Sequence, residues 1–363
     1  MRRISRNPRK FDLFDLYAAI GREAKIPIMD VASVERIKSV IEADLKVHHS
    51  NESLFFGKRT EEMFGYIAAA LGKCQVVKKE DSGGFVRDSE MQIPDYRLFL
   101  EDGRQYLVEV KNRHNDKVVF TEKYVGKLRK YADLNKLELL FAIYYSADNR
   151  WNLISPDKMN LVAGQYYLST ETSLSENQMG PILGDILIKA PEPLVLRITI
   201  DRNEPSSIIV RDGKKHVTGT VLEGKFFSEG VMIEDTIEEK IANFLYDNAP
   251  WVSEGLIAHL TQTGAVDYVE DVCWLRPSEG AAFSFLGILS SMLSSAYITT
   301  TSSNGRAIAI APEADPGEFA IKIPPGFQGK VLKIAMYILQ PGLTARPQEE
   351  TQLEHSITLP LTA

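Results

Sequence analysis

The stretch PDYRLFLEDGRQYLVEVKN, residues 94–112, has the alternation of a β-hairpin but carries charged residues inside it. A two-residue turn at Asp102-Gly103 would mix apolar and charged side chains on both faces. A three-residue loop closed by Gly103 in the left-handed region would instead place Asp95 opposite Glu109. We expect this second register, because it separates the two faces.

In the expected register, one face of the hairpin is apolar and the other is charged, because directly opposed residues share a face. The apolar face comprises Tyr96, Leu98, Leu100, Tyr106, Val108 and Val110. The other face gathers Asp95, Glu109 and Lys111 at the end away from the turn, with Arg97 and Gln105 further along. The hairpin therefore predicts a cluster of two carboxylates and an ammonium group.

Such a cluster has a chemical use. Two adjacent carboxylates raise each other's pKa unless a cation neutralises them, and their oxygens suit Mg²⁺ or Mn²⁺. A bound metal can activate water and stabilise charge on a phosphate, while a nearby lysine orients that water. This chemistry indicates phosphodiester hydrolysis. The alternative is a solvent-facing hairpin with an ordinary ion pair of Glu109 and Lys111, since short patterns of common residues recur by chance.

The segments around the hairpin predict an α/β unit. Expected are helices over residues 31–45, 59–73 and 121–136, and strands over 74–78 and 137–145. The second helix has a stop at Gly72. From that helix onward the order is helix, three strands, helix and strand, which predicts a mixed sheet.

The residues of the hairpin resemble the PD-(D/E)xK nuclease superfamily, which includes type II restriction enzymes, Mrr-like nucleases and archaeal Holliday-junction resolvases. The matching residues are Pro94-Asp95 and Glu109-Val110-Lys111, preceded by Glu61-Glu62-Met63-Phe64 in a helix that ends at Gly72. The resemblance covers about residues 55–150. It implies a restriction-endonuclease-like αβββαβ core.

The resemblance also implies roles for individual residues. Asp95 and Glu109 would hold Mg²⁺, for which Mn²⁺ would substitute, together with the carbonyl of Val110. Lys111 would serve the attacking water, and Glu61 would assist. DNA would be the substrate. Lys123, Lys127 and Lys130 on the following helix could meet the DNA backbone, although a charge run is usually the solvated face of a helix.

Length and charge predict two domains. A chain of 363 residues is long enough for a nuclease domain over 1–150, with an N-terminal helical extension, and an α+β domain over 151–363. The first part has 27 Lys and Arg against 23 Asp and Glu, and the second has 15 against 26. Any nucleic-acid site therefore belongs in the first part.

The second domain offers no recognised pattern. Helices expected over 236–248 and 252–264, followed by a strand, could suggest a winged-helix reader of DNA. The absence of Lys and Arg over 241–275 argues against it. We also expect a capping box of Asp235 and Glu238 at the first of these helices.

These observations predict a metal-dependent endodeoxyribonuclease of restriction or phage-defence type. A repair or recombination nuclease is one alternative, and a non-catalytic module that keeps the fold for nucleic-acid binding or assembly is another. Two cysteines are too few for a disulfide framework, and the basic N-terminus lacks a signal-peptide core, so we expect a cytoplasmic protein without membrane contact. We also expect a homodimer or higher homo-oligomer, and a regulatory partner or ligand at the second domain.

Overall fold

The structure is a computed structural model. It describes residues 25, 35–40, 43, 52–80, 90–114, 118–211, 214–274, 286–319, 323–324, 327–338 and 340–342. The predicted N-terminal helical extension lies largely outside the described residues, although residues 35–40 are helical. Among the residues that are described, no helix is long and apolar enough to cross a membrane.

The first half of the described chain builds a mixed sheet. Its strands are β1 (Cys74–Lys79), β2 (Tyr96–Leu100), β3 (Gln105–Arg113), β5 (Glu138–Tyr145) and β6 (Arg150–Ile154), in the order β1-β2-β3-β5-β6. The β3–β5 pair is parallel and the other pairs are antiparallel. The helices of this part are α3 (Glu52–Leu71) and α4 (Glu122–Asn135). The expectation of an α/β fold with a mixed sheet is confirmed.

The expected register of the central hairpin is also confirmed. Tyr96 pairs with Val108. The Leu100 N–H donates to the Arg104 carbonyl at 2.9 Å, and Gly103 has φ +86°. A residue with a Cβ would be strained at that φ, so the glycine allows the three-residue loop.

Local signals explain where the two helices begin and end. Gly72, with φ +85°, follows the last residue of α3, as expected. The Thr121 hydroxyl caps α4 by accepting from the Tyr124 N–H, and Lys136 ends it in the left-handed conformation. The cap at Thr121 fixes the start of α4, and with it the position of Tyr124.

Both faces of the first sheet are buried. One face packs against α3 and includes Leu98 and Val108. The other packs against α4 and a small sheet, and includes Leu107 and Phe141. The small sheet has the order β4-β8-β7, with β4 (Val118–Thr121), β7 (Asn160–Val162) and β8 (Gln165–Leu168). Within this packing, the middle of β3 carries a buried carboxylate, that of Glu109.

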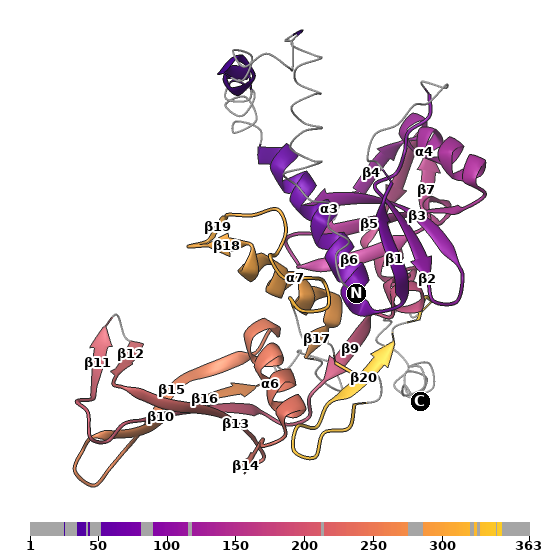
Figure 1. Ribbon diagram of the computed structural model, residues 1–363. Coiled ribbons are helices and arrows are strands. Elements are labelled where there is room, and N and C mark those ends of the chain that lie inside the picture. Colours follow the sequence, from indigo (N-terminus) through magenta and orange to yellow (C-terminus); the bar gives the residue numbers. More distant parts are fainter. Residues whose placement is uncertain are drawn as a thin grey trace.

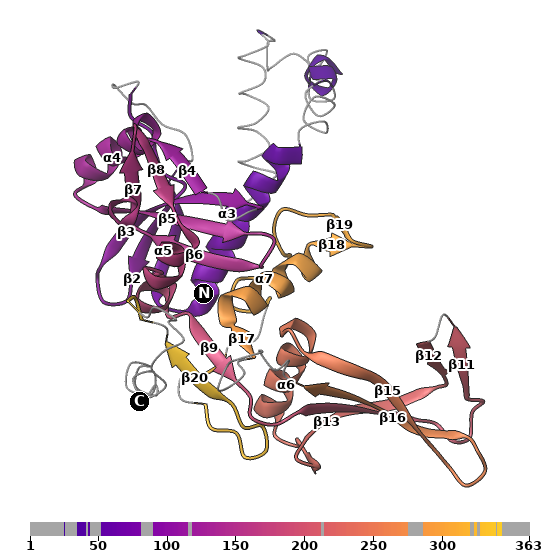
Figure 2. The ribbon, with the colours of Figure 1, turned by 180° about the vertical axis from the view of Figure 1, so that it is seen from behind.

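The chain continues through short helical elements into a second five-stranded sheet. The helical elements are η2 (Pro156–Lys158), α5 (Thr170–Ser175) and η3 (Met179–Leu183). The second sheet has the order β14-β13-β10-β16-β15, with β10 (Leu194–Ile200), β13 (Val221–Ser228), β14 (Val231–Met232), β15 (Val252–Leu260) and β16 (Val266–Trp274). It carries the hairpin of β11 (Ser207–Arg211) and β12 (Lys214–Thr218) and the helix α6 (Thr236–Asn248). Figures 1 and 2 show this sheet as an arm that extends away from the first sheet.

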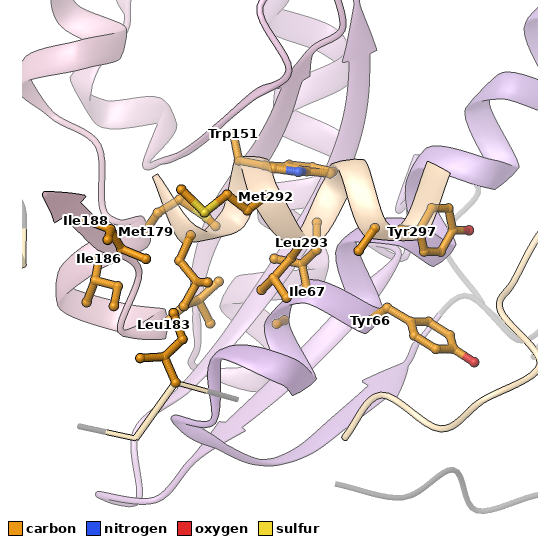
Figure 3. Packing of buried hydrophobic residues seen from close by; sticks show 14 of the residues in the cluster. Tyr66, Ile67, Trp151, Met179, Leu183, Ile186, Ile188, Met292, Leu293 and Tyr297 are labelled. Atoms are coloured by element: carbon orange, nitrogen blue, oxygen red, sulfur yellow. The ribbon is translucent and has the colours of Figure 1, made fainter. Parts of the chain in front are cut away.

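The C-terminal elements return to the first sheet. They are β17 (Gly287–Ile288), α7 (Leu289–Thr300), β18 (Ser302–Ser303), β19 (Arg306–Ala307) and β20 (Ala335–Ile338). Strands β17 and β20 flank β9 (Ile186–Lys189). Figure 3 shows Leu293 and Tyr297 of α7 next to Ile67 and Tyr66 of α3, with Trp151 of β6 close by. One hydrophobic cluster therefore joins the first sheet to the C-terminal elements.

Two expectations for the second half are wrong. Residues 252–260 form the strand β15 and not a helix, because they pair with β16 along most of their length. The capping box at α6 is only half formed. Asp235 accepts from the Ile237 and Glu238 N–H groups, but the Glu238 carboxylate accepts from the backbone of residues 330–332 instead of reaching back.

Candidate active site

Asp95 lies immediately before β2 and is held by its neighbours on both sides. Its carboxylate Oδ2 accepts from the Val110 N–H at 2.7 Å. Its own carbonyl accepts from the Glu80 N–H at 2.9 Å, just beyond the end of β1. The Asp95 side chain is therefore fixed against β3 beside Glu109 and Lys111, as the register predicts.

Glu109 is a buried carboxylate, only 3% exposed. Its Oε1 accepts from Lys111 Nζ at 2.6 Å and from the Tyr124 hydroxyl. Its Oε2 is buried and has no hydrogen-bond partner among the described residues. The Glu109–Lys111 ion pair therefore exists, but not on a solvent-facing surface, and a buried oxygen without a partner is costly unless a ligand satisfies it.

The surroundings of Asp95 raise its pKa to about 7. Burial of the carboxyl is the largest cause, and the negative charge of Glu109 is the next. The Val110 N–H and the Lys111 ammonium act in the opposite direction and lower this pKa, but they do not offset the other effects. Two carboxylates thus lie beside a single ammonium group in a largely buried site. Because one positive charge does not neutralise two negative charges, this arrangement favours the binding of a further cation.

Tyr124 is a site residue that the sequence did not reveal. It lies in the first turn of α4, and its hydroxyl donates to Glu109 Oε1. Lys111 Nζ lies 5.5 Å from the centroid of its ring. Burial and the charge of Glu109 raise the pKa of Tyr124, so its hydroxyl remains a donor. No spacing pattern links α4 to β3, so only the fold shows this contact.

Glu61 of α3 is near the site but is engaged elsewhere. Its carboxylate pairs with Lys58 Nζ at 2.7 Å. Its charge contributes to the raised pKa of Asp95, although less than burial and Glu109 do. The structure thus brings Glu61 within electrostatic range of Asp95, and its assisting role stays a prediction.

The three lysines of α4 lie outside this cluster. Lys123 and Lys127 are 3.8 and 3.6 Å from the Glu90 carboxylate. Lys130 is exposed. Their role in binding DNA stays a prediction, and for two of them a DNA phosphate would compete with Glu90.

The donor set fits a divalent cation. Among the described residues, no group of three or more His, Cys, Asp or Glu side chains could hold a metal ion. Asp95 and Glu109 supply two hard carboxylates, and no described residue gives the buried Glu109 Oε2 a hydrogen bond. The backbone of Val110 adjoins Asp95 through its N–H, and a third ligand from its carbonyl stays a prediction.

The comparisons with known proteins point to the same part of the chain. Residues 67–178 match the family model described as archaeal Holliday junction resolvase (Hjc). The resemblance to the PD-(D/E)xK nuclease superfamily is thereby confirmed over a partial region. The matched region contains Asp95, Glu109 and Lys111 and begins after Glu61.

One solved structure is similar over a comparable span. It is Hjc, a Holliday junction resolvase from the archaeal hyperthermophile Archaeoglobus fulgidus, with 13% sequence identity and a TM-score of 0.23. The similarity covers 27% of this chain and 79% of that one. No curated protein matches this chain.

Proposed function

We propose that this protein is a metal-dependent endodeoxyribonuclease with a restriction-endonuclease-like αβββαβ core. The observation that carries the proposal is the meeting of Asp95, Glu109 and Lys111 at one end of the β2–β3 hairpin, with the pKa of Asp95 raised to about 7. The family match to archaeal Holliday junction resolvases over residues 67–178 supports it independently.

Asp95 and Glu109 would hold Mg²⁺, with Mn²⁺ as a substitute. When bound, the cation supplies Lewis-acid chemistry, lowering the pKa of water and neutralising charge on the phosphate. The chain's residues then have distinct tasks. The Lys111 ammonium, which donates to Glu109 Oε1, orients the attacking water. The Tyr124 hydroxyl holds Glu109 in place. The water oxygen adds to phosphorus as its proton passes to solvent, the phosphorus–oxygen bond to the leaving strand breaks, and the leaving oxygen takes a proton from solvent.

The substrate class is DNA, and branched DNA is the first form to test. The matched family consists of junction resolvases, so a role in repair or recombination fits at least as well as the restriction or phage-defence type. The non-catalytic module remains the rival of another class. The buried Glu109 Oε2, which has no hydrogen-bond partner among the described residues, argues against that rival, because a module without catalysis gains nothing from keeping this energetic cost.

Cleavage assays with matched variants test the proposal. Supercoiled plasmid, linear duplex and a four-way junction are incubated with wild type, Asp95→Ala and Lys111→Ala in Mg²⁺, Mn²⁺ or EDTA. We expect metal-dependent cleavage that falls by about 100-fold or more in both variants. Asp102→Ala and Lys78→Ala are the controls, because both residues are exposed and pair with near neighbours, Asp102 with Arg104 and Lys78 with Glu80.

Two outcomes of the cleavage assay would contradict the proposal. Cleavage that persists in EDTA, or survives Asp95→Ala, contradicts the assigned site. If no DNA form is cut, isothermal titration with Mn²⁺ separates the two hypotheses. A nuclease that awaits an activator should bind Mn²⁺ and lose this binding in Asp95→Ala, whereas a non-catalytic module should show no such difference.

A further inference from the structure

The short hairpin of β18 and β19 follows α7 and is closed by an Asn-Gly turn. Ser302 pairs with Ala307, and Ser303 pairs with Arg306. Asn304 and Gly305 have φ values of +51° and +73°, the conformation of tight hairpin turns whose twist matches that of the strands. The hairpin therefore has a defined shape, with Ser303, Asn304, Gly305 and Arg306 exposed.

Arg59 anchors this hairpin to α3. Its Nη2 donates to Thr301 Oγ1 at 2.6 Å and to Ser302 Oγ at 2.9 Å. The Tyr297 hydroxyl, whose nearest acceptor is the Ile310 carbonyl, lies 3.2 Å from the Arg59 carbonyl. Figures 1 and 2 both show the hairpin beside α3. These contacts attach the hairpin to the helix that also carries Glu61, although residues two apart on a helix face different sides of it.

The anchor also decides which side of the hairpin is free. Ser302 and Ala307 share one face, and Ser303 and Arg306 share the other, because opposed residues alternate along a hairpin. Arg59 holds the face of Ser302. The face with Arg306 is turned outward.

The charge around the hairpin is unusual for this half of the chain. Residues 151–363 carry 15 Lys and Arg against 26 Asp and Glu, yet Arg306 is the only charged residue between Glu279 and Glu313. Within the described chain, the structure gives Arg306 no hydrogen bond or ion pair. Its guanidinium is accompanied by the hydroxyl of Ser303 and the amide of Asn304. Such a set of donors, in a sequence segment without Asp or Glu, suits a phosphodiester backbone.

We propose that the β18–β19 hairpin is a second DNA-contacting element of the nuclease, in which Arg306 binds a backbone phosphate away from the scissile bond. The inference rests on the proposed function and assigns part of the DNA-binding surface to the C-terminal half of the chain. Arg59 is its positioning residue. The hairpin extends the footprint on DNA beyond the first sheet without contributing to the chemical step.

Binding measured without turnover tests this inference. Fluorescence anisotropy with a labelled four-way junction and a labelled duplex, in EDTA over a range of salt, gives Kd and its salt dependence. We expect Arg306→Ala to raise Kd by about 5-fold or more and to reduce the salt slope by about one. Arg306→Lys keeps the charge and recovers most of the salt slope. In cleavage assays the effect falls on KM and not on kcat.

Arg202→Ala is the matched control, because Arg202 is an exposed arginine in the same acidic half whose charge is paired with Asp267. It should bind DNA like the wild type. Arg306→Ala should also melt like the wild type, since its side chain has no hydrogen bond or ion pair to lose among the described residues.

An Arg306→Ala variant with unchanged Kd and salt slope overturns the inference while leaving the proposed nuclease intact. A loss of kcat with unchanged KM overturns it as well, because that result places Arg306 in the chemical step. Wild-type protein that neither binds nor cuts any DNA overturns the proposed function itself.

Discussion

The two five-stranded sheets of this protein are used in opposite ways. In β3 of the first sheet, the neighbouring residues Leu107 and Val108 point to opposite faces, and both are fully buried. In β15 of the second sheet, the neighbouring residues Leu256 and Ile257 are 39% and 42% exposed. A sheet buried on both sides can hold a carboxylate pair in fixed geometry. A sheet with open apolar faces offers area to a partner.

The largest expected effect comes from truncating matched leucines in the two sheets. Leu107→Ala removes a fully buried side chain and should lower the free energy of unfolding by about 3 kcal/mol. Leu256→Ala removes a side chain that water already reaches, so we expect a loss of about 0.5 kcal/mol. Urea unfolding followed by circular dichroism measures both. Equal losses would show that the arm is covered in solution.

A smaller effect concerns the cost of the carboxylate pair in the first sheet. The pKa of Asp95 is raised to about 7, above that of an aspartate in the unfolded chain. Full stability is therefore present below the unfolded pKa of about 4 and is lost as the pH rises towards 7. Asp95→Asn does not titrate, so it should be more stable than the wild type by about 2 kcal/mol at pH 8.

The advantage of Asp95→Asn should shrink as the pH falls from 7 to 4, and thermal unfolding across that range measures it. Added Mg²⁺ should stabilise the wild type more than the variant. An advantage that is the same at every pH would mean that the charge of Asp95 is not its cause.

The smallest expected effect on stability comes from the edge of the arm. Strand β15 is the last in its sheet and carries exposed Ile257, and an open edge of this kind promotes pairing with another chain. We expect a homodimer, in which Ile257→Lys lowers the dimer fraction while changing the free energy of unfolding by about 0.5 kcal/mol or less. Sedimentation equilibrium measures the association.

Val210→Lys is the control for this edge. Val210 is 65% exposed on the β11–β12 hairpin and not on β15. If both variants dissociate equally, the dimer contact is not specific to the edge strand. A wild-type protein that is monomeric would contradict the expected homodimer.

Local rules made the hairpin of the first sheet predictable. Gly103 and the alternation around it determine the register, and the register alone brings Asp95 beside Glu109. Tyr124 could not be found in this way, because its contact with Glu109 depends on how α4 packs on the sheet. The sequence thus specifies the carboxylate pair, and tertiary packing adds the group that holds it.

The error at β15 has a specific cause. Val252, Leu256 and Leu260 are spaced four residues apart, which is typical of a helix. In the structure, Gly255 has φ +89° and the register shifts between Ser253 and Leu256. This bulge changes which residues share a face, so the strand does not show simple alternation. The division into domains at residue 150 stays a prediction.

The packing of α7 against α3 and β6 has a consequence for biosynthesis. The ribosome makes Asp95, Glu109 and Lys111 early, but the cluster that supports their sheet also includes Leu293 and Met336. The nascent chain cannot complete this core until those late residues have emerged, because contacts far apart in sequence form only when both partners are present. A truncated translation product would therefore carry the candidate catalytic residues without their folded support.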